Sequence, residues 1–252
     1  YASRGLGDVY KRQVFIDCDD SFCMDPQKLK AFCEEACTWD GITLTHNGAA
    51  VKAVVVVHVF GNMADMEAIM EIAGTYGLKV IEDATEALGT KYTEGCYAGR
   101  YAGTIGDFGC FSFNGNKIIT TSGGGALVCR DEADAQHALK MATQAREPVA
   151  WYEHTELGYN YRMSNVVAGV VRGQYPHLEE HIAQKKAVYE RYREGLRDLP
   201  VTMNPIVAGT EPNYWLSALI IDEDAMCAQL RDDSRALYLS LIHISEPTRR
   251  VV

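Results

Sequence analysis

The chain has 252 residues, of which 47% are hydrophobic and 23% are charged. This composition is typical of a globular protein and excludes the disordered and fibrous classes. The formal net charge of -10 repels phosphate backbones and argues against a nucleic-acid partner. The longest apolar stretch, residues 53–60, is far shorter than the roughly 20 residues that span a bilayer, so no membrane segment is predicted.

The eight cysteines could in principle form disulfides or bind zinc. However, no two of them have the CxxC spacing, and no secretory signal opens the chain. We therefore expect free thiols in a cytoplasmic protein, where the compartment is reducing.

The first half of the chain alternates between predicted strands and helices. Residues 14–17 are expected to form a short strand, and Pro26 is expected to be the first residue of a helix. Residues 53–60 are apolar on both faces, which is typical of a buried parallel strand. A helix over residues 66–73 and another buried strand over residues 78–81 follow.

The second half predicts two more strands, at residues 108–113 and 125–129, and then mostly helix. A long helix is expected between residues 178 and 199, and a strand of a second, smaller domain over residues 215–221. Strands that alternate with helices indicate an α/β fold, in which helices cover both faces of a mainly parallel sheet.

Three reactive side chains follow strand ends, where open parallel sheets bind ligands. Asp83 ends one strand, Ser112 lies at the end of another, and Lys117 follows five residues later. An amine that forms a Schiff base, a carboxylate that faces a pyridine nitrogen and a hydroxyl that binds phosphate are the groups that pyridoxal phosphate requires. Taken singly, Asp83 could cap a helix beginning near Ala84, and Lys117 could be a solvated loop residue.

Three segments resemble signature motifs of the DegT/DnrJ/StrS aminotransferases. They are EDATEALG at residues 82–89, GDFGCFSFNGNK at residues 106–117 and GYNYRMS at residues 158–164. The segment VHVFG at residues 57–61 agrees with them in order and spacing. This resemblance implies fold type I, the aspartate-aminotransferase fold, with pyridoxal 5'-phosphate as cofactor.

The resemblance also implies a role for each matching residue. Lys117 is the lysine that holds the cofactor and carries the catalysis, and Asp83 pairs with the pyridine nitrogen. Glu86 lies near the ring and its 3-hydroxyl, at a position where many members have glutamine. Ser112 reaches the phosphate, and Asn160 reaches the phosphate of a partner subunit, which implies a homodimer with shared active sites. His58 is interpreted as a supporting residue behind the site.

The implied reaction moves an amino group from L-glutamate to a nucleotide-linked keto sugar. The form SFNGNK, with IITTSGGG after it, resembles the enzymes that aminate C4 of UDP-linked 4-keto-6-deoxy-N-acetylhexosamines for bacterial surface glycans, of the bacillosamine and legionaminic type. Two alternatives stay open: an enzyme for another sugar nucleotide, including a sugar dehydratase, and an inactive fragment or a non-enzyme with this fold. A dehydratase typically has histidine at the position of Lys117.

Both ends of the chain are expected to be foreign to the protein, and the alternative is that they are ordinary frayed termini. Residues 1–13 and 238–252 show no amphipathic pattern, and GLGDVYKRQ and SLIHISEPTR resemble translated sequencing adaptors. Residues 14–175 are then expected to form a large cofactor-binding domain, and residues 176–237 part of a small domain. The Gly/Thr-rich phosphate segment and the ring-stacking aromatic of the family are expected before Val14, so this chain on its own is expected to lack them.

Overall fold

The computed structural model describes residues 12–222 and residue 225, and the two ends expected to be foreign lie almost wholly outside this range. The chain forms two compact units. Among the described residues, the first contains residues 12–186 and the returning segment Pro205–Leu216. The second contains Ala187–Asn204 and residues 217–222. The first division between the two units falls after Lys186.

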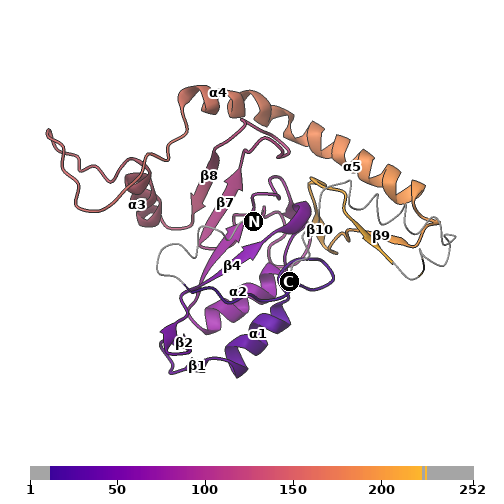
Figure 1. Ribbon diagram of the computed structural model, residues 1–252, viewed down its shortest axis with the longest axis horizontal. Coiled ribbons are helices and arrows are strands. Elements are labelled where there is room, and N and C mark those ends of the chain that lie inside the picture. The colour runs from indigo at the N-terminus through magenta and orange to yellow at the C-terminus, as the bar shows by residue number, and fades with distance from the viewer. Residues whose placement is uncertain (1–11, 223–224, 226–252) are drawn as a thin grey trace, which may run out of the picture. The chain divides into compact units, whose positions relative to one another are not determined.

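A four-stranded sheet is the centre of the first unit (Figure 1). Its order is β4-β5-β7-β8, and β4, β5 and β7 are parallel whereas β8 is antiparallel to β7. The strands are β4 (Ala53–Val57), β5 (Lys79–Asp83), β7 (Phe108–Ser112) and β8 (Gly125–Cys129). The mainly parallel sheet that the strand and helix pattern predicts is confirmed.

The apolar run at residues 53–60 forms a shorter strand than predicted. β4 ends at Val57, and a 3-10 turn, η1 (Val59–Gly61), follows. Within that turn Phe60 has φ of 59°, which no strand residue adopts. The chain therefore turns sharply at the carboxyl end of the sheet and brings the residues after β4 to the edge where Asp83 lies.

Helices α1 (Pro26–Glu35) and α2 (Met66–Thr75) pack beside each other next to β4 (Figure 1). Each begins at an aspartate whose side chain accepts hydrogen bonds from the first turn, Asp25 for α1 and Asp65 for α2. Their apolar faces join the buried strand residues in one core cluster, which includes Leu29, Cys33, Val56, Met66, Ile69, Ala73 and Val80.

The predicted strand at residues 14–17 is wrong, because these residues adopt no strand structure. Phe15 is 80% exposed, and no described strand lies beside it to supply hydrogen-bond partners. A small antiparallel sheet of short strands follows α1 instead. It contains β1 (Thr38–Trp39), β2 (Leu44–His46) and β3 (Ala49–Ala50). Strands of two or three residues are too short to show the alternation on which sequence-based prediction depends.

The remaining elements of the first unit are a strand pair and further helices. Strand β6 (Lys91–Tyr92) pairs with β10 (Thr210–Glu211), which joins the returning segment to the unit. The helices are α3 (Glu132–Ala142), α4 (Asn165–Gln174), η2 (Tyr175–His177) and the first half of α5 (Leu178–Gly195). None of the helices in the described part of the chain combines the length and the apolar character needed to cross a membrane.

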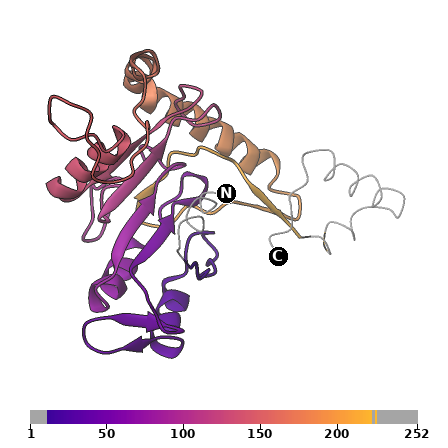
Figure 2. The same cartoon turned by 60° about the vertical axis from the view of Figure 1, so that its left-hand side comes forward.

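The second unit contains the end of α5 and the antiparallel pair β9 (Val201–Met203) and β11 (Leu219–Ile221), as Figure 2 shows at the orange end of the ribbon. The strand predicted over residues 215–221 begins only at Leu219. Trp215 and Leu216 belong to the first unit, where Trp215 is buried. The seven cysteines of the described residues are all free, as expected for thiols.

Candidate active site

Asp83 and Ser112 lie on the same face of the sheet at its carboxyl edge. Asp83 pairs with Cys110 across β5 and β7, and Ser112 is two residues further along β7. Because paired residues share a face and side chains alternate along a strand, both side chains point to one side. Asp83 is 7% exposed, and its Oδ1 accepts a hydrogen bond from the N–H of Thr85 at 3.2 Å. No helix follows at Ala84, so the helix-cap interpretation of Asp83 is wrong.

Glu86 lies in the turn after β5, between the two charged residues that the sequence singled out. Its Oε2 accepts a hydrogen bond from the N–H of Phe60 at 2.8 Å, and its Oε1 is 3.9 Å from Nζ of Lys117. Burial raises the pKa of the Glu86 carboxyl above its ordinary value, and the nearby charge of Asp83 adds to this. The Phe60 N–H and the Lys117 ammonium act in the opposite direction. Asp83 and Lys117 are thus both close enough to Glu86 for their charges to act on it.

Lys117 is held in the loop after β7, with its side chain only 12% exposed. Its N–H donates to the carbonyl of Asn114, and its Nζ lies 4.2 Å from the centre of the Trp215 ring. A lysine in contact with an aromatic face and a half-buried carboxylate is unlike a solvated loop lysine. The interpretation of Lys117 as a solvated loop residue is therefore wrong.

The returning segment at Asn213 links the turns that carry these residues. The buried side chain of Asn213 donates to the carbonyls of Glu86 at 2.8 Å and Leu88 at 3.0 Å. Its Oδ1 accepts from the N–H of Trp215 at 2.9 Å. Sequence reasoning missed Asn213 and Trp215, because their contacts are with residues more than 95 positions earlier in the chain.

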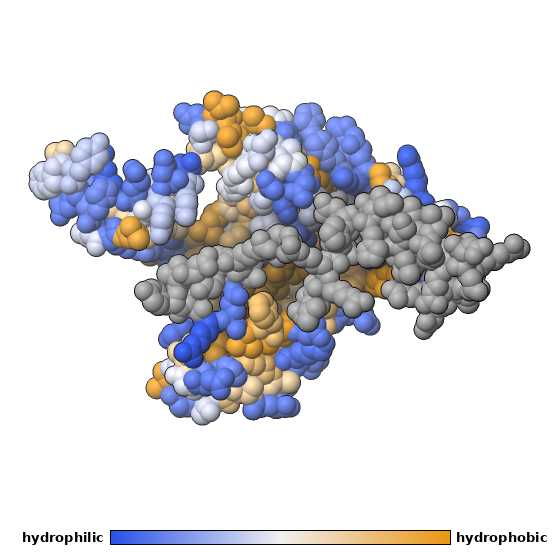
Figure 3. Space-filling model, viewed as in Figure 1, coloured by the Kyte–Doolittle hydropathy of each residue, from blue (hydrophilic) through white to orange (hydrophobic). Residues whose placement is uncertain are grey.

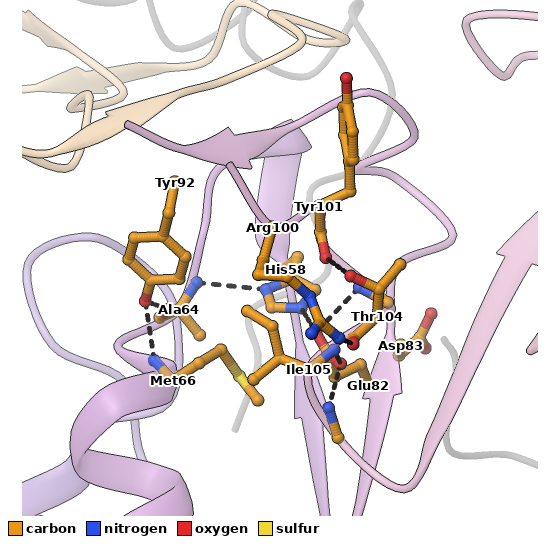
Figure 4. Close-up of polar contacts among 12 residues, drawn as sticks. His58, Ala64, Met66, Glu82, Asp83, Tyr92, Arg100, Tyr101, Thr104 and Ile105 are labelled. Carbon is orange, nitrogen blue, oxygen red and sulfur yellow. Dashed lines mark hydrogen bonds and ion pairs between the residues drawn. The ribbon is translucent and has the colours of Figure 1, made fainter. Parts of the chain in front are cut away.

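His58 and Glu82 form a fully buried pair behind Asp83 (Figure 4). Nδ1 of His58 accepts from the N–H of Ala64 at 3.1 Å, which places the ring proton on Nε2, 3.0 Å from Glu82. Glu82 also accepts backbone N–H bonds from Gly103, Ile105 and Gly106. Burial opposes ionisation of Glu82, but these donors outweigh it and lower its pKa.

The other two site residues have different surroundings. Oγ of half-buried Ser112 accepts a hydrogen bond from the N–H of Asn114 at 3.2 Å, so it lies at the start of the loop that carries Lys117. Asn160 is exposed, in a loop where it bridges to Thr143. The structure therefore groups Asp83, Glu86, Ser112 and Lys117 around the sheet edge, and Asn160 has an exposed position.

This donor set fits pyridoxal phosphate in its chemistry. The edge offers a sheltered primary amine at Lys117, a nearly buried carboxylate at Asp83 and a hydroxyl at Ser112 with loop N–H groups beside it. These are the groups that can hold an aldehyde, a pyridine nitrogen and a phosphate. The sheet and its solved structural neighbour together define fold type I, the fold of the aspartate-aminotransferase class of proteins.

The sequence pattern of the DegT/DnrJ/EryC1/StrS aminotransferase family matches residues 8–244, and the chain belongs to this family. Members of the family depend on pyridoxal phosphate. The chain is 44% identical over 211 residues to EpsN of Bacillus subtilis, named as a pyridoxal phosphate-dependent aminotransferase, covering 83% of this chain and 51% of that protein.

Two further relatives have names that include a sugar nucleotide. The GDP-perosamine synthase of Vibrio cholerae is 34% identical, over 69% of this chain and 46% of that protein. A UDP-N-acetyl-3-dehydro-alpha-D-glucosamine 3-aminotransferase of Acidithiobacillus ferrooxidans is 32% identical, over 78% of this chain and 48% of that protein. The chain thus spans about half the length of the curated relatives it matches.

The solved structures agree with the fold. The aminotransferase TlmJ of Streptoalloteichus hindustanus has a TM-score of 0.76 at 27% identity, over 95% of this chain and 60% of that chain.

Proposed function

We propose that this chain carries the cofactor-binding half of an aminotransferase that moves an amino group from L-glutamate to a nucleotide-linked keto sugar in the cytoplasm. The observation that carries the proposal is the grouping of Lys117, Glu86 and Asp83 at one sheet edge. Membership of an aminotransferase family supports the reaction class, and relatives named for GDP- and UDP-linked sugars support the substrate class.

In this proposal the residues divide the work. Lys117 would hold the cofactor through its amine, and this amine, once the amino donor has displaced it, would take a proton from the α-carbon of the donor. Asp83 keeps a proton on the pyridine nitrogen, and Ser112 receives the phosphate. Bound pyridoxal phosphate supplies an electron sink that makes the α-proton of the donor easier to remove. Asn160 completes the phosphate site of a second subunit in a homodimer.

For the acceptor we propose C4 of a UDP-linked 4-keto-6-deoxy-N-acetylhexosamine, for a surface glycan. The support is the SFNGNK form of the lysine loop. The alternatives are a GDP-linked sugar or a 3-keto sugar, for which relatives at 34% and 32% identity provide a specific reason. A panel of the three keto sugars, each followed by mass spectrometry of the sugar nucleotide, separates them.

The central experiment compares Lys117→Ala with Lys30→Ala in the complete protein. Lys30 is a matched control, because it also lies 3.9 Å from a glutamate but on an exposed helix face. Borohydride reduction of the unsubstituted protein should fix a pyridoxyl group on Lys117, as peptide mass spectrometry would show. Lys117→Ala should lose this group and all nitrogen transfer, whereas Lys30→Ala should keep both. Normal turnover of Lys117→Ala would contradict the proposal.

Asp83→Asn tests a different step. Without the carboxylate charge the pyridine nitrogen loses its proton, and the ring withdraws electrons less well. We expect covalent attachment to Lys117 to persist while turnover falls by about three powers of ten, which equals about 4 kcal/mol. A variant with ordinary turnover would exclude Asp83 from this role, and a variant without the attached group would show that Asp83 acts in binding instead.

A further inference from the structure

Trp215 contacts both the side chain and the backbone of the lysine loop. Its ring lies 4.2 Å from Nζ of Lys117, and its Nε1–H donates to the carbonyl of Asn116 at 2.7 Å. The indole is 5% exposed, so its surroundings are protein rather than solvent. One side chain thus contacts both the residue before the lysine and the lysine's own amine.

The position of Trp215 is itself set by a hydrogen-bonded network. Oδ1 of Asn213 accepts from the N–H of Trp215, and Nδ2 of Asn213 donates to the carbonyls of Glu86 and Leu88. The N–H of Asn213 donates to Oγ1 of Thr90, which in turn donates to the carbonyl of Gly61. Asn213 has no exposed surface, and all its side-chain polar atoms are paired. The indole is therefore tied to the turn that carries Glu86.

We propose that Trp215 is a positioning residue that holds the amine of Lys117 in the direction from which it binds the cofactor. The inference rests on the proposed function, since it requires Lys117 to be the residue that attaches the cofactor. Trp215 acts through Lys117 and the Asn116 carbonyl.

The nature of the two contacts explains why an indole serves here. Nζ of Lys117 is 3.9 Å from Oε1 of Glu86, which is too far for a hydrogen bond. The other oxygen of Glu86, Oε2, already accepts a hydrogen bond from the N–H of Phe60. An aromatic face attracts the ammonium without forming a directed bond that must be broken when the amine reacts. The indole N–H meanwhile anchors the ring to the loop, which a phenylalanine could not do.

A double-mutant cycle on cofactor affinity tests this role without measuring turnover. The dissociation constant of pyridoxal phosphate is measured by equilibrium dialysis for the complete protein, for Trp215→Leu, for Lys117→Ala and for the double variant. We expect Trp215→Leu to weaken binding about tenfold, equal to about 1.4 kcal/mol, when Lys117 is present. In the Lys117→Ala background the same change should have no effect, because there is no amine to position.

Two further variants serve as a milder substitution and as a control. Trp215→Phe keeps a ring but removes the N–H donor, and it should weaken binding less than Trp215→Leu in the presence of Lys117. It also replaces Trp215→Leu in the cycle if that variant fails to fold. Trp39→Phe is the matched control, because Trp39 is partly exposed in β1 and contacts Tyr76, and it should leave the affinity unchanged.

The outcomes separate this inference from the proposed function. An equal loss of affinity in both Lys117 backgrounds, or no loss in either, would overturn the positioning role and leave the proposed function intact. If borohydride fixes no pyridoxyl group on Lys117 in the unsubstituted protein, the proposed function fails and the positioning role fails with it.

Discussion

Gly61 shows how one residue determines the geometry of the site. It has φ of 85° and is buried against the Asn213 side chain. A Cβ at this position would lie 1.8 Å from Oδ1 of Asn213, the atom that holds the N–H of Trp215. Both the backbone conformation and the close approach therefore require glycine. The sequence identified the VHVFG segment but could not show what its glycine contacts.

We expect Gly61→Ala to be much more costly than Gly48→Ala. Gly48 has φ of 73°, and no atom lies within 4 Å of the place that a Cβ would occupy, so its substitution measures backbone strain alone, about 1 kcal/mol. Gly61→Ala adds displacement of Asn213, and we expect a total loss of at least about 3 kcal/mol in the free energy of unfolding. Urea denaturation of both variants measures the difference. Equal losses would mean that Asn213 moves away freely.

Residues with a local signal were found from the sequence, and residues without one were missed. Asp83, Glu86, Ser112 and Lys117 lie in two short motifs at strand ends, and the structure groups them at one edge. Trp215 gave no such signal, because a tryptophan at the start of an apolar run is also what a buried strand predicts. Its contact with Lys117 depends on a chain reversal that no local pattern encodes.

At the scale of elements, α4 begins where the third motif ends. Ser164, the last residue of GYNYRMS, is the N-cap of α4, and its Oγ accepts from the N–H of Val167 at 3.3 Å. This hydrogen bond satisfies one of the donors that every helix leaves free at its first turn. The serine of the motif thus has a structural role, whereas Asn160 in the same motif is exposed.

Ser164→Ala should therefore lower the free energy of unfolding by about 1 kcal/mol. Ser164→Asp should preserve most of the stability, because a carboxylate also caps the helix and interacts favourably with its dipole. Urea denaturation followed by circular dichroism measures both. If Ser164→Asp lowers the free energy of unfolding as much as Ser164→Ala does, the hydroxyl must make a further contact that a carboxylate does not replace.

The predicted helices and the predicted buried strands of the main sheet agree with the structure. The shortest strands were predicted wrongly or not at all. The helices at Pro26–Glu35 and Met66–Thr75 and the buried strands β5, β7 and β8 were all expected near their observed positions. The strand at residues 14–17 was wrong, and the short strands β1, β2 and β3 were not predicted. A short strand is stabilised by the neighbour it pairs with, which a single segment does not reveal.

At the scale of the whole molecule, the first unit exposes an apolar surface on α4. Val166 is 78% exposed and Val170 is 42% exposed, one helical turn apart, and Figure 3 shows hydrophobic residues gathered over this helix. The nearby η2 residue Tyr175 is 59% exposed. A patch of this kind commonly marks an interface between proteins. It supports the proposal of a homodimer in which Asn160 completes the partner's site.

Charged residues on this surface should dissociate such a dimer. We expect the Val166→Glu, Val170→Glu double variant of the complete protein to raise the dimer dissociation constant at least about hundredfold, equal to about 2.7 kcal/mol. Ile42→Glu is the control, because Ile42 is 85% exposed in the loop before β2. Analytical ultracentrifugation measures the dissociation constants. A double variant as dimeric as the control would place the interface elsewhere.

The sequence alone determined the class of fold and the family, and it singled out candidate reactive residues at the strand ends. These depend on hydrophobic periodicity and on motifs a few residues long, both of which are local properties of the chain. Only the tertiary structure decided how Lys117 is sheltered and which residues hold it. Hydrogen bonds from Asn213 and Trp215 to turns more than 95 positions earlier depend on the folded path of the chain. Buried polar groups in a folded protein need hydrogen-bond partners, and these partners can lie far away in the sequence. A local sequence pattern does not show which residues they are.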